Sequence, residues 1–254
     1  MTHDPLEAAS SSERFGLYSA ATAGVGVLAS GPIALVTVAL TQPQPRWVDA
    51  RTYVEHFHPL QLLPFFAGFI LIAGFFGLII SVSALSGPEH RLSRCCAVAS
   101  ATVFAALITV NYAVQVSFIP GLVQRYEASD ASVLAALSMA RPGSLAWTLE
   151  LWGYAWMGLA SWLVAPFFVG GRLEQFTRRM FVLNGVVSLC TPWLSCVTSE
   201  WMTQWYGILA FGLWNAVALA MSVGAFFAFR NRLRGWSDGQ ELQPIESTQR
   251  LITT

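Results

Sequence analysis

The sequence has no lysine, so its fourteen basic side chains are all arginines. This absence excludes chemistry that needs a lysine amine, such as the Schiff base of a retinal photoreceptor or of a pyridoxal phosphate enzyme. The formal net charge is zero, so no broad electrostatic attraction to nucleic acid is expected. Nucleic acid is therefore not predicted as a partner.

Charged residues of either sign are scarce. Only 11% of the 254 residues are charged, whereas a soluble globular chain has about 25%. Hydrophobic residues make up 55% of the sequence, and its mean hydropathy is +0.54. The segments between the apolar runs are too short for a sizeable soluble domain. The sequence therefore predicts an integral membrane protein whose first partner is the lipid bilayer.

Recognisable motifs for metals, phosphates and nucleophilic catalysis are also lacking. The four cysteines are Cys95, Cys96, Cys190 and Cys196. They have no metal-site spacing such as C-x-x-C, and we expect them to be small, buried and inert. His56 and His58 are two potential metal ligands, but a metal centre needs three or four, and His3 and His90 fall on the opposite side of the predicted topology. There is no phosphate-binding P-loop and no G-x-S-x-G nucleophile elbow. No metal and no cofactor is predicted, and no catalytic residue is assigned.

Six segments are apolar and long enough to cross a bilayer, which takes about 20 residues. They are residues 16–40, 60–85, 96–119, 144–169, 180–197 and 205–229. The predicted fold class is therefore all-α, a polytopic bundle of about six transmembrane helices over residues 1–236. Residues 237–254 are predicted to be a short polar, disordered tail. Pro32 removes a backbone donor from the first span and is expected to kink it.

The arginines predict the orientation of the bundle. An even number of spans places both termini on one side, together with nine arginines: Arg14, Arg91, Arg94, Arg172, Arg178, Arg179, Arg230, Arg232 and Arg234. The opposite side holds four: Arg46, Arg51, Arg125 and Arg141. Because cytoplasmic loops carry the excess of basic residues, both termini are predicted to be cytoplasmic. Compact loops and arginine-only basic usage favour a multi-pass protein of a bacterial inner membrane.

Two connections on the non-cytoplasmic side are long enough to hold structure of their own. Residues 41–58 contain Trp47, Tyr53 and Phe57, and residues 121–143 contain three apolar side chains at helical spacing after Asp130. Each is either a short helix at the membrane interface or a plain loop.

One carboxylate, Glu150, falls inside a predicted span. A charged side chain in the bilayer costs at least about 2.5–3.5 kcal/mol at the helix centre, so such a residue usually faces the bundle interior. With no arginine in any span to pair with it, Glu150 is expected either to be neutral or to bind a proton or a cation when the site opens to water. Polar residues at similar depth complete a candidate ligand-binding layer on the non-cytoplasmic side: Asn111, Gln115, Glu150, Tyr154 and Asn215.

Three functions stay open at this point. The first is binding or transport of a small or amphiphilic ligand through this polar pocket, and it is the function we favour. The second is a membrane enzyme acting on a lipid or isoprenoid, with Glu150 as acid or base and His56 or His58 assisting. The third is a structural or assembly subunit in which Glu150 only ties helices together. The sequence also leaves room for an oligomer.

Overall fold

The computed structural model describes residues 5–198 and 201–241, and within these the side chains of residues 11–198 and 201–235. The long helices of this part are α1 (Pro5–Leu28), α4 (Leu63–Ala84), α5 (Arg91–Ala113), α8 (Leu145–Val164), α9 (Arg172–Val197) and α10 (Trp205–Glu241). Two of them are extended through π-helical turns: α2 (Ala34–Thr41) continues α1 after Ala29–Ile33, and α6 (Ile119–Gln124) continues α5 after Val114–Phe118. The short helices are α3 (Ala50–Glu55) and α7 (Ala131–Leu137). Short 3-10 turns lie at Pro59–Leu62, Pro88–His90, Ala128–Asp130, Ala165–Phe167 and Trp201–Thr203. Strands are absent from these described residues, so the predicted all-α class is confirmed.

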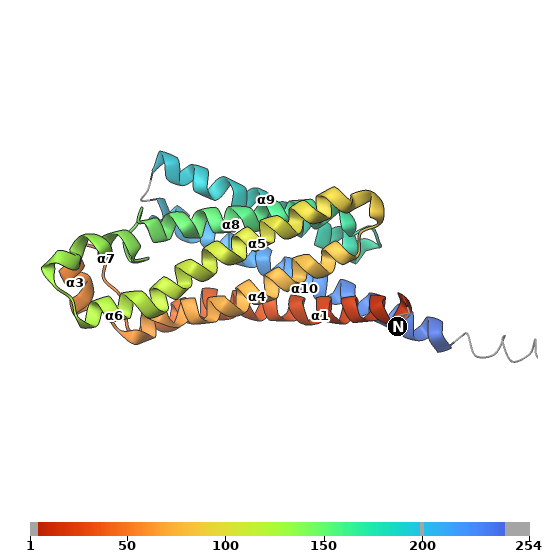
Figure 1. The fold of residues 1–254 in the computed structure, drawn as a ribbon, viewed down its shortest axis with the longest axis horizontal. Coiled ribbons are helices and arrows are strands. Elements are labelled where there is room, and N and C mark those ends of the chain that lie inside the picture. Colours follow the sequence, from red (N-terminus) through yellow and green to blue (C-terminus); the bar gives the residue numbers. More distant parts are fainter. Residues whose placement is uncertain (1–4, 199–200, 242–254) are drawn as a thin grey trace, which may run out of the picture.

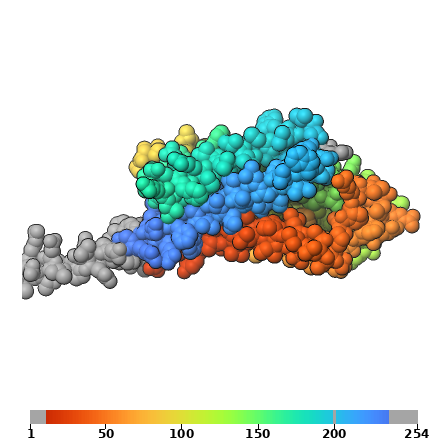
Figure 2. Space-filling view, turned by 180° about the vertical axis from the view of Figure 1, so that it is seen from behind, coloured from red at the N-terminus to blue at the C-terminus, as the bar shows by residue number. Residues whose placement is uncertain are grey.

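The six long helical rods form a closed ring. Each packs on its neighbours in the order α1, α4, α5, α8, α9, α10 and back to α1. Figure 2 shows part of this ring from behind, with α10 lying between α1 and α9. Successive rods run in opposite directions, and the start of α1 and the end of α10 lie at the same end of the bundle (Figure 1). This arrangement is the one that an even number of crossings requires.

Five of the predicted spans are confirmed as helices that are long and apolar enough to cross a membrane, at Ser11–Thr41, Pro59–Ala84, Pro88–Gln124, Arg172–Val197 and Trp205–Gly235. The remaining one, α8, has 20 residues, which is about 30 Å of helix. It lies in the ring between α5 and α9. Its lower hydropathy has a simple origin, because the helix carries a carboxylate, a tyrosine and several tryptophans among its apolar residues.

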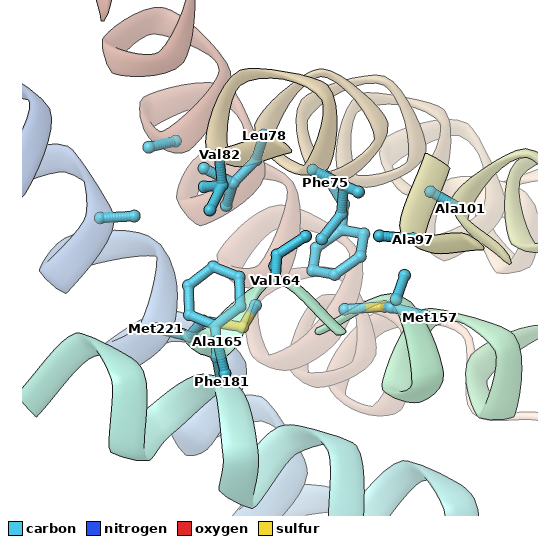
Figure 3. Packing of buried hydrophobic residues seen from close by; sticks show 14 of the residues in the cluster. Phe75, Leu78, Val82, Ala97, Ala101, Met157, Val164, Ala165, Phe181 and Met221 are labelled. Carbon is cyan, nitrogen blue, oxygen red and sulfur yellow. The ribbon is translucent and has the colours of Figure 1, made fainter. Parts of the chain in front are cut away.

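The core of the bundle is built from large apolar side chains that point into the ring. Phe75, Phe104, Met157, Phe181 and Phe229 are all fully buried. They come from α4, α5, α8, α9 and α10, so nearly every rod contributes to one cluster, part of which is drawn in Figure 3. Between helices in lipid, such packing is the main source of association, because the surrounding acyl chains are as apolar as the side chains.

The kink predicted at Pro32 is present. Gly31 leaves helical geometry at φ −86° and ψ −105°, inside the π-helical turn that joins α1 to α2. Before the kink, α1 and α4 approach very closely. A Cβ atom on Gly74 would overlap the backbone nitrogen of Ala23, and one on Gly26 would overlap the backbone of Leu71. Small residues at this contact are therefore a steric requirement.

A small second core caps one end of the ring. The connections of residues 41–58 and 121–143 do form short helices, α3 and α7, and these pack on each other, with α7 also on α6. Their shared core includes Tyr53, Leu122 and Leu134, all buried, with Trp47 and Phe57 against it. We call this unit, α3, α6 and α7, the cap. It lies at the end of the bundle away from the start of α1 (Figure 1), and we call the opposite end, where α1 starts, the arginine-rich end.

Two expectations need adjustment. All four cysteines are free and exposed, so the prediction that they are buried was wrong; they lie on helix faces that point away from the ring. In addition, α10 continues to Glu241, past the predicted start of the tail at residue 237. The rest of the predicted tail, residues 242–254, lies outside the described residues.

Candidate functional site

Glu150 lies one and a half turns into α8. The helix begins where the Ser144 side chain accepts a hydrogen bond from the backbone nitrogen of Trp147, at 3.3 Å. Capping of this kind satisfies a backbone donor that the first turn would otherwise leave unpaired. Glu150 is six residues further on, about 9 Å along the helix axis. The local sequence thus places a carboxyl group below the cap, inside the ring.

Both carboxyl oxygens of Glu150 accept hydrogen bonds from α5. The Asn111 side-chain nitrogen donates to Oε2 at 2.9 Å, and the Tyr112 hydroxyl donates to Oε1 at 2.8 Å. The Tyr154 hydroxyl, one turn along α8, lies 3.3 Å from that of Tyr112. Asn111 and Tyr112 are buried, and Glu150 and Tyr154 are partly buried. We call these four residues the Glu150 cluster.

The donors around this carboxyl are all uncharged. Among the residues that the structure describes, no arginine or histidine forms an ion pair with Glu150. Arg141, the nearest basic residue along the chain, is exposed in the loop before α8. Two neutral donors lower the cost of a buried charge without cancelling it.

Aromatic rings enclose the cluster. The Tyr112 ring lies edge-on to Phe65 and Phe69 of α4, with centroids 5.4 and 6.1 Å away. It also rests against Gly68, where a Cβ atom would overlap the ring. Gly68 therefore makes the space in which the Tyr112 hydroxyl can reach Glu150.

Tyr154 connects the cluster to the far side of the ring. Its ring packs edge-on against Trp214 of α10, with a centroid distance of 4.8 Å. The Trp214 indole nitrogen donates to the Ser188 hydroxyl of α9 at 3.1 Å. Deeper in the bundle, the Asn184 side chain donates to Ser161 at 2.9 Å, while its buried Oδ1 atom has no hydrogen-bond partner among the residues described. Polar contacts thus link α5, α8, α9 and α10 around the interior.

The loop between α7 and α8 covers the cluster from the cap side. Gln115 donates to the carbonyl of Leu137 at 2.8 Å and accepts from the backbone nitrogen of Met139 at 3.0 Å. Trp147 donates to the Met139 carbonyl at 2.7 Å. The Met139 sulfur lies 3.6 Å from the Asn111 nitrogen that also binds Glu150. Residues 138–143 are therefore fastened directly above the carboxyl, and we call them the cover loop.

The five predicted site residues are not all together. Glu150, Asn111 and Tyr154 share one cluster, and Gln115 lies next to it and holds the cover loop. Asn215 lies apart: it donates to the Phe211 carbonyl of its own helix, and its buried Oδ1 rests on Gly31 at the α1 kink. Whether any of them binds a ligand stays a prediction.

Sequence reasoning missed Tyr112 and Met139. Tyr112 is adjacent to Asn111 in the chain, and neighbouring helix residues point about 100° apart. It still reaches the same carboxyl because its side chain is long and Gly68 leaves room for the ring. The sequence signal that could have predicted the position of Tyr112 is Gly68, which follows two phenylalanines of α4. A glycine within a span leaves room for a large side chain of a neighbouring helix.

The two histidines at the cap have backbone partners. The Nδ1 atom of His56 is 2.9 Å from the Thr52 carbonyl, and that of His58 accepts from the Leu60 nitrogen at 3.2 Å. Among the described residues, no three histidine, cysteine or acidic side chains come together as a metal centre would require. A comparison with known proteins finds no family model, no curated relative and no solved structure that matches the chain.

Proposed function

We propose that this integral membrane protein binds a small amphiphilic cation at Glu150, from the side of the cap. The observation that carries the proposal is the carboxyl group held by two neutral donors, with no basic partner among the described residues. A carboxylate in such a place stabilises a cation that comes to it, because it gains a charge partner in a medium of low dielectric constant. An uncharged ligand would leave the carboxylate uncompensated.

The surrounding rings support an organic cation over a bare metal ion. The Tyr112 hydroxyl binds the carboxyl and lies next to that of Tyr154, and the two tyrosine rings pack against Phe65 of α4 and Trp214 of α10. Aromatic faces attract cations, with tryptophan and tyrosine the strongest, and they also bind the apolar part of an amphiphile. A metal ion would instead require more oxygen ligands than one carboxyl group and one amide supply.

Entry requires the cover loop to move. In the structure it is closed by the Gln115 and Trp147 hydrogen bonds. These few contacts are of the kind that open on the microsecond to second timescale. Movement of the cover loop would turn a closed binding site into a gated one, which is the first requirement for transport.

The test is ligand-dependent melting in lipid nanodiscs, with tetraphenylphosphonium and benzyltrimethylammonium as probes. A ligand at about one hundred times its dissociation constant stabilises the folded protein by about 2.7 kcal/mol. We expect a probe to raise the melting temperature of wild type but not of Glu150→Gln, which keeps the shape and removes the charge. Glu55→Gln, at an exposed carboxylate of the cap that pairs with Arg51, is the matched control and should respond like wild type. Equal responses of wild type and Glu150→Gln would show that the carboxylate of Glu150 takes no part in binding the probe.

A second candidate function is structural, and one observation favours it. Because both oxygens of Glu150 are engaged by α5, the same side chain fastens α5 to α8. In that case Glu150→Gln retains most of the stability and no cationic probe shifts the melting temperature of wild type. A subunit of a larger complex would give this result.

A further inference from the structure

A groove runs between α4 and α5 at the arginine-rich end, on the opposite end of the bundle from the Glu150 cluster. Its volume is about 530 Å³, and its lining includes Ile80, Ser83, Ala84, Arg94, Val98 and Ala99. The groove opens on the outside of the ring, where a membrane protein meets lipid. It takes no part in the site described above.

The groove is polar at the arginine-rich end of the bundle and apolar toward the middle of the bundle. Ser83 is one residue from the end of α4, and Arg94 is three residues after the start of α5. Ile80 on α4 and Val98 on α5 lie about one turn closer to the middle of the bundle. This order, from a cationic side chain at the helix end to aliphatic side chains along the span, matches the order from headgroup to acyl chain in a phospholipid.

The Ser83 hydroxyl is buried and has no hydrogen-bond partner within the described part of the chain. The residue is 2% exposed. Other helical serines of this protein, such as Ser81, Ser100 and Ser161, each donate to the carbonyl four residues earlier at 2.8 to 2.9 Å. An unpaired buried hydroxyl is unfavourable, and Ser83 is one of the residues that line the groove. Ser83 thus retains a donor for a group that enters there.

Arg94 is also available. Among the described residues it forms no ion pair. The acid in the turn between α4 and α5, Glu89, lies against His90 at 3.7 Å. A guanidinium group presents a planar fork of donors that fits phosphate oxygens, and it is weakly hydrated enough to do so at a membrane surface.

We propose that this groove binds one anionic phospholipid, with the headgroup phosphate on Arg94 and Ser83 and an acyl chain along Ile80, Val98 and Ala99. Charge complementarity selects an anionic headgroup. Nine arginines of the sequence belong to this side of the bundle, and Arg94, which lines the groove, forms no ion pair within the described residues. The proposal is independent of the function proposed for Glu150.

The test is native mass spectrometry of the full-length chain in detergent, titrated separately with dioleoyl-phosphatidylglycerol and dioleoyl-phosphatidylcholine. Wild type should bind the first lipid of phosphatidylglycerol more tightly than that of phosphatidylcholine. Arg94→Gln should weaken the phosphatidylglycerol site about fivefold, as expected for the loss of one arginine at a membrane surface. Ser83→Ala should weaken it by a smaller factor. Arg91→Gln, an exposed arginine one turn earlier that does not line the groove, is the matched control and should bind like wild type.

A second variant keeps the test sharp if Arg94→Gln folds poorly. Ala99→Trp fills the apolar part of the groove and keeps every charge, and it should also lose the tight first lipid. Glu150→Gln should leave this lipid in place. The proposal is overturned if Arg94→Gln and Arg91→Gln behave alike, if Ala99→Trp binds like wild type, or if soluble glycerol phosphate displaces the lipid at equal concentration, because a free anion site would then explain the binding.

Discussion

Two glutamates at opposite ends of the bundle, Glu174 and Glu150, differ in the groups that compensate the charge of their carboxylates. Glu174, in the first turn of α9 at the arginine-rich end, accepts two hydrogen bonds from Arg232 of α10 at 2.9 and 3.0 Å and one from the backbone nitrogen of Gly170 at 2.7 Å. Among the residues that the structure describes, Glu150 accepts hydrogen bonds from two neutral groups, those of Asn111 and Tyr112. The first carboxylate is balanced by a cation of the protein itself, and the second is not. A partly buried acid without a counter-charge among the described residues is the feature on which the proposed cation site rests.

The largest expected effect comes from removing the unbalanced acid. Glu150→Ala should lower the free energy of unfolding by about 3 kcal/mol, because the buried donors of Asn111 and Tyr112 each lose a partner. Glu150→Gln should cost less, because the Tyr112 hydroxyl can turn to Tyr154 and accept from the new amide. Thermal melting of both variants in nanodiscs measures the difference. If Glu150→Ala has the same melting temperature as wild type, the Glu150 cluster does not stabilise the packing of α5 on α8.

The next largest effect is expected at Gly68, which leaves the space that the Tyr112 ring needs to reach Glu150. Gly68→Ala should destabilise the protein by about 2 kcal/mol, because its new methyl group overlaps the Tyr112 ring. Gly212→Ala, at a helical glycine of α10 where a Cβ atom would meet no neighbour within 4 Å, should be neutral or slightly stabilising. Melting temperatures and the binding of the cationic probes are measured on both. Equal behaviour of the two variants would contradict the steric role of Gly68.

The balanced acid should show a smaller and salt-sensitive effect. A double-mutant cycle on Glu174→Gln and Arg232→Gln should give a coupling energy of about 1 kcal/mol, because the pair is bidentate but partly exposed, with side chains 14% and 26% exposed. This coupling should fall as salt is raised to about 1 M, since exposed charges are screened. The effect of Glu150→Ala should not change with salt. If the coupling energy between Glu174 and Arg232 does not change with salt, the expected difference in salt dependence between Glu174 and Glu150 is contradicted.

The smallest effect is at the cap. The backbone nitrogen of Thr52 donates to the Asp49 carboxylate at 2.7 Å, and this hydrogen bond at the start of α3 lowers the pKa of Asp49. An acid whose pKa is lower in the folded state stabilises that state above its ordinary pKa of about 4, and this contribution is lost as the pH falls through the lowered value. Amide hydrogen exchange in α3, corrected for intrinsic rates, should therefore speed up from about pH 5 to about pH 3.

Asp49→Asn is the matched variant for this measurement. Its amide oxygen caps the helix without titrating, so its corrected exchange rates in α3 should not follow the pH. If wild type and the variant show the same pH profile, protonation of another acid opens the cap.

The sequence was sufficient for five of the six predicted spans because lipid imposes a simple rule. Every backbone donor in hydrocarbon must be paired within the segment, so a long apolar run is a helix. The same rule located the kink at Pro32, where a donor is missing. It also singled out Glu150 and Asn111, because a polar residue in a span must find a partner across helices, and these two found each other.

The details that were missed depend on rotation and on distant residues. Tyr112 joins the cluster because Gly68, 44 positions earlier, leaves room for it. Asn215 is at a suitable depth but points at the α1 kink, since depth along a helix does not fix the direction of a side chain. The cysteines were expected inside because free cysteine is usually buried in soluble proteins. In a membrane the outer face of a helix is apolar too, so a small side chain such as that of Cys190, further inside α9, can face lipid at no cost.

The exposed cysteines make the native chain its own sidedness assay. Cys95 and Cys96 lie in the second turn of α5, at the arginine-rich end, whereas Cys196 is one residue before the opposite end of α9. A membrane-impermeant maleimide added to intact cells, and then to inverted vesicles, reaches these two groups from opposite compartments. Mass shifts on the corresponding peptides report which end faces the cell interior, and no cysteine has to be engineered for the experiment.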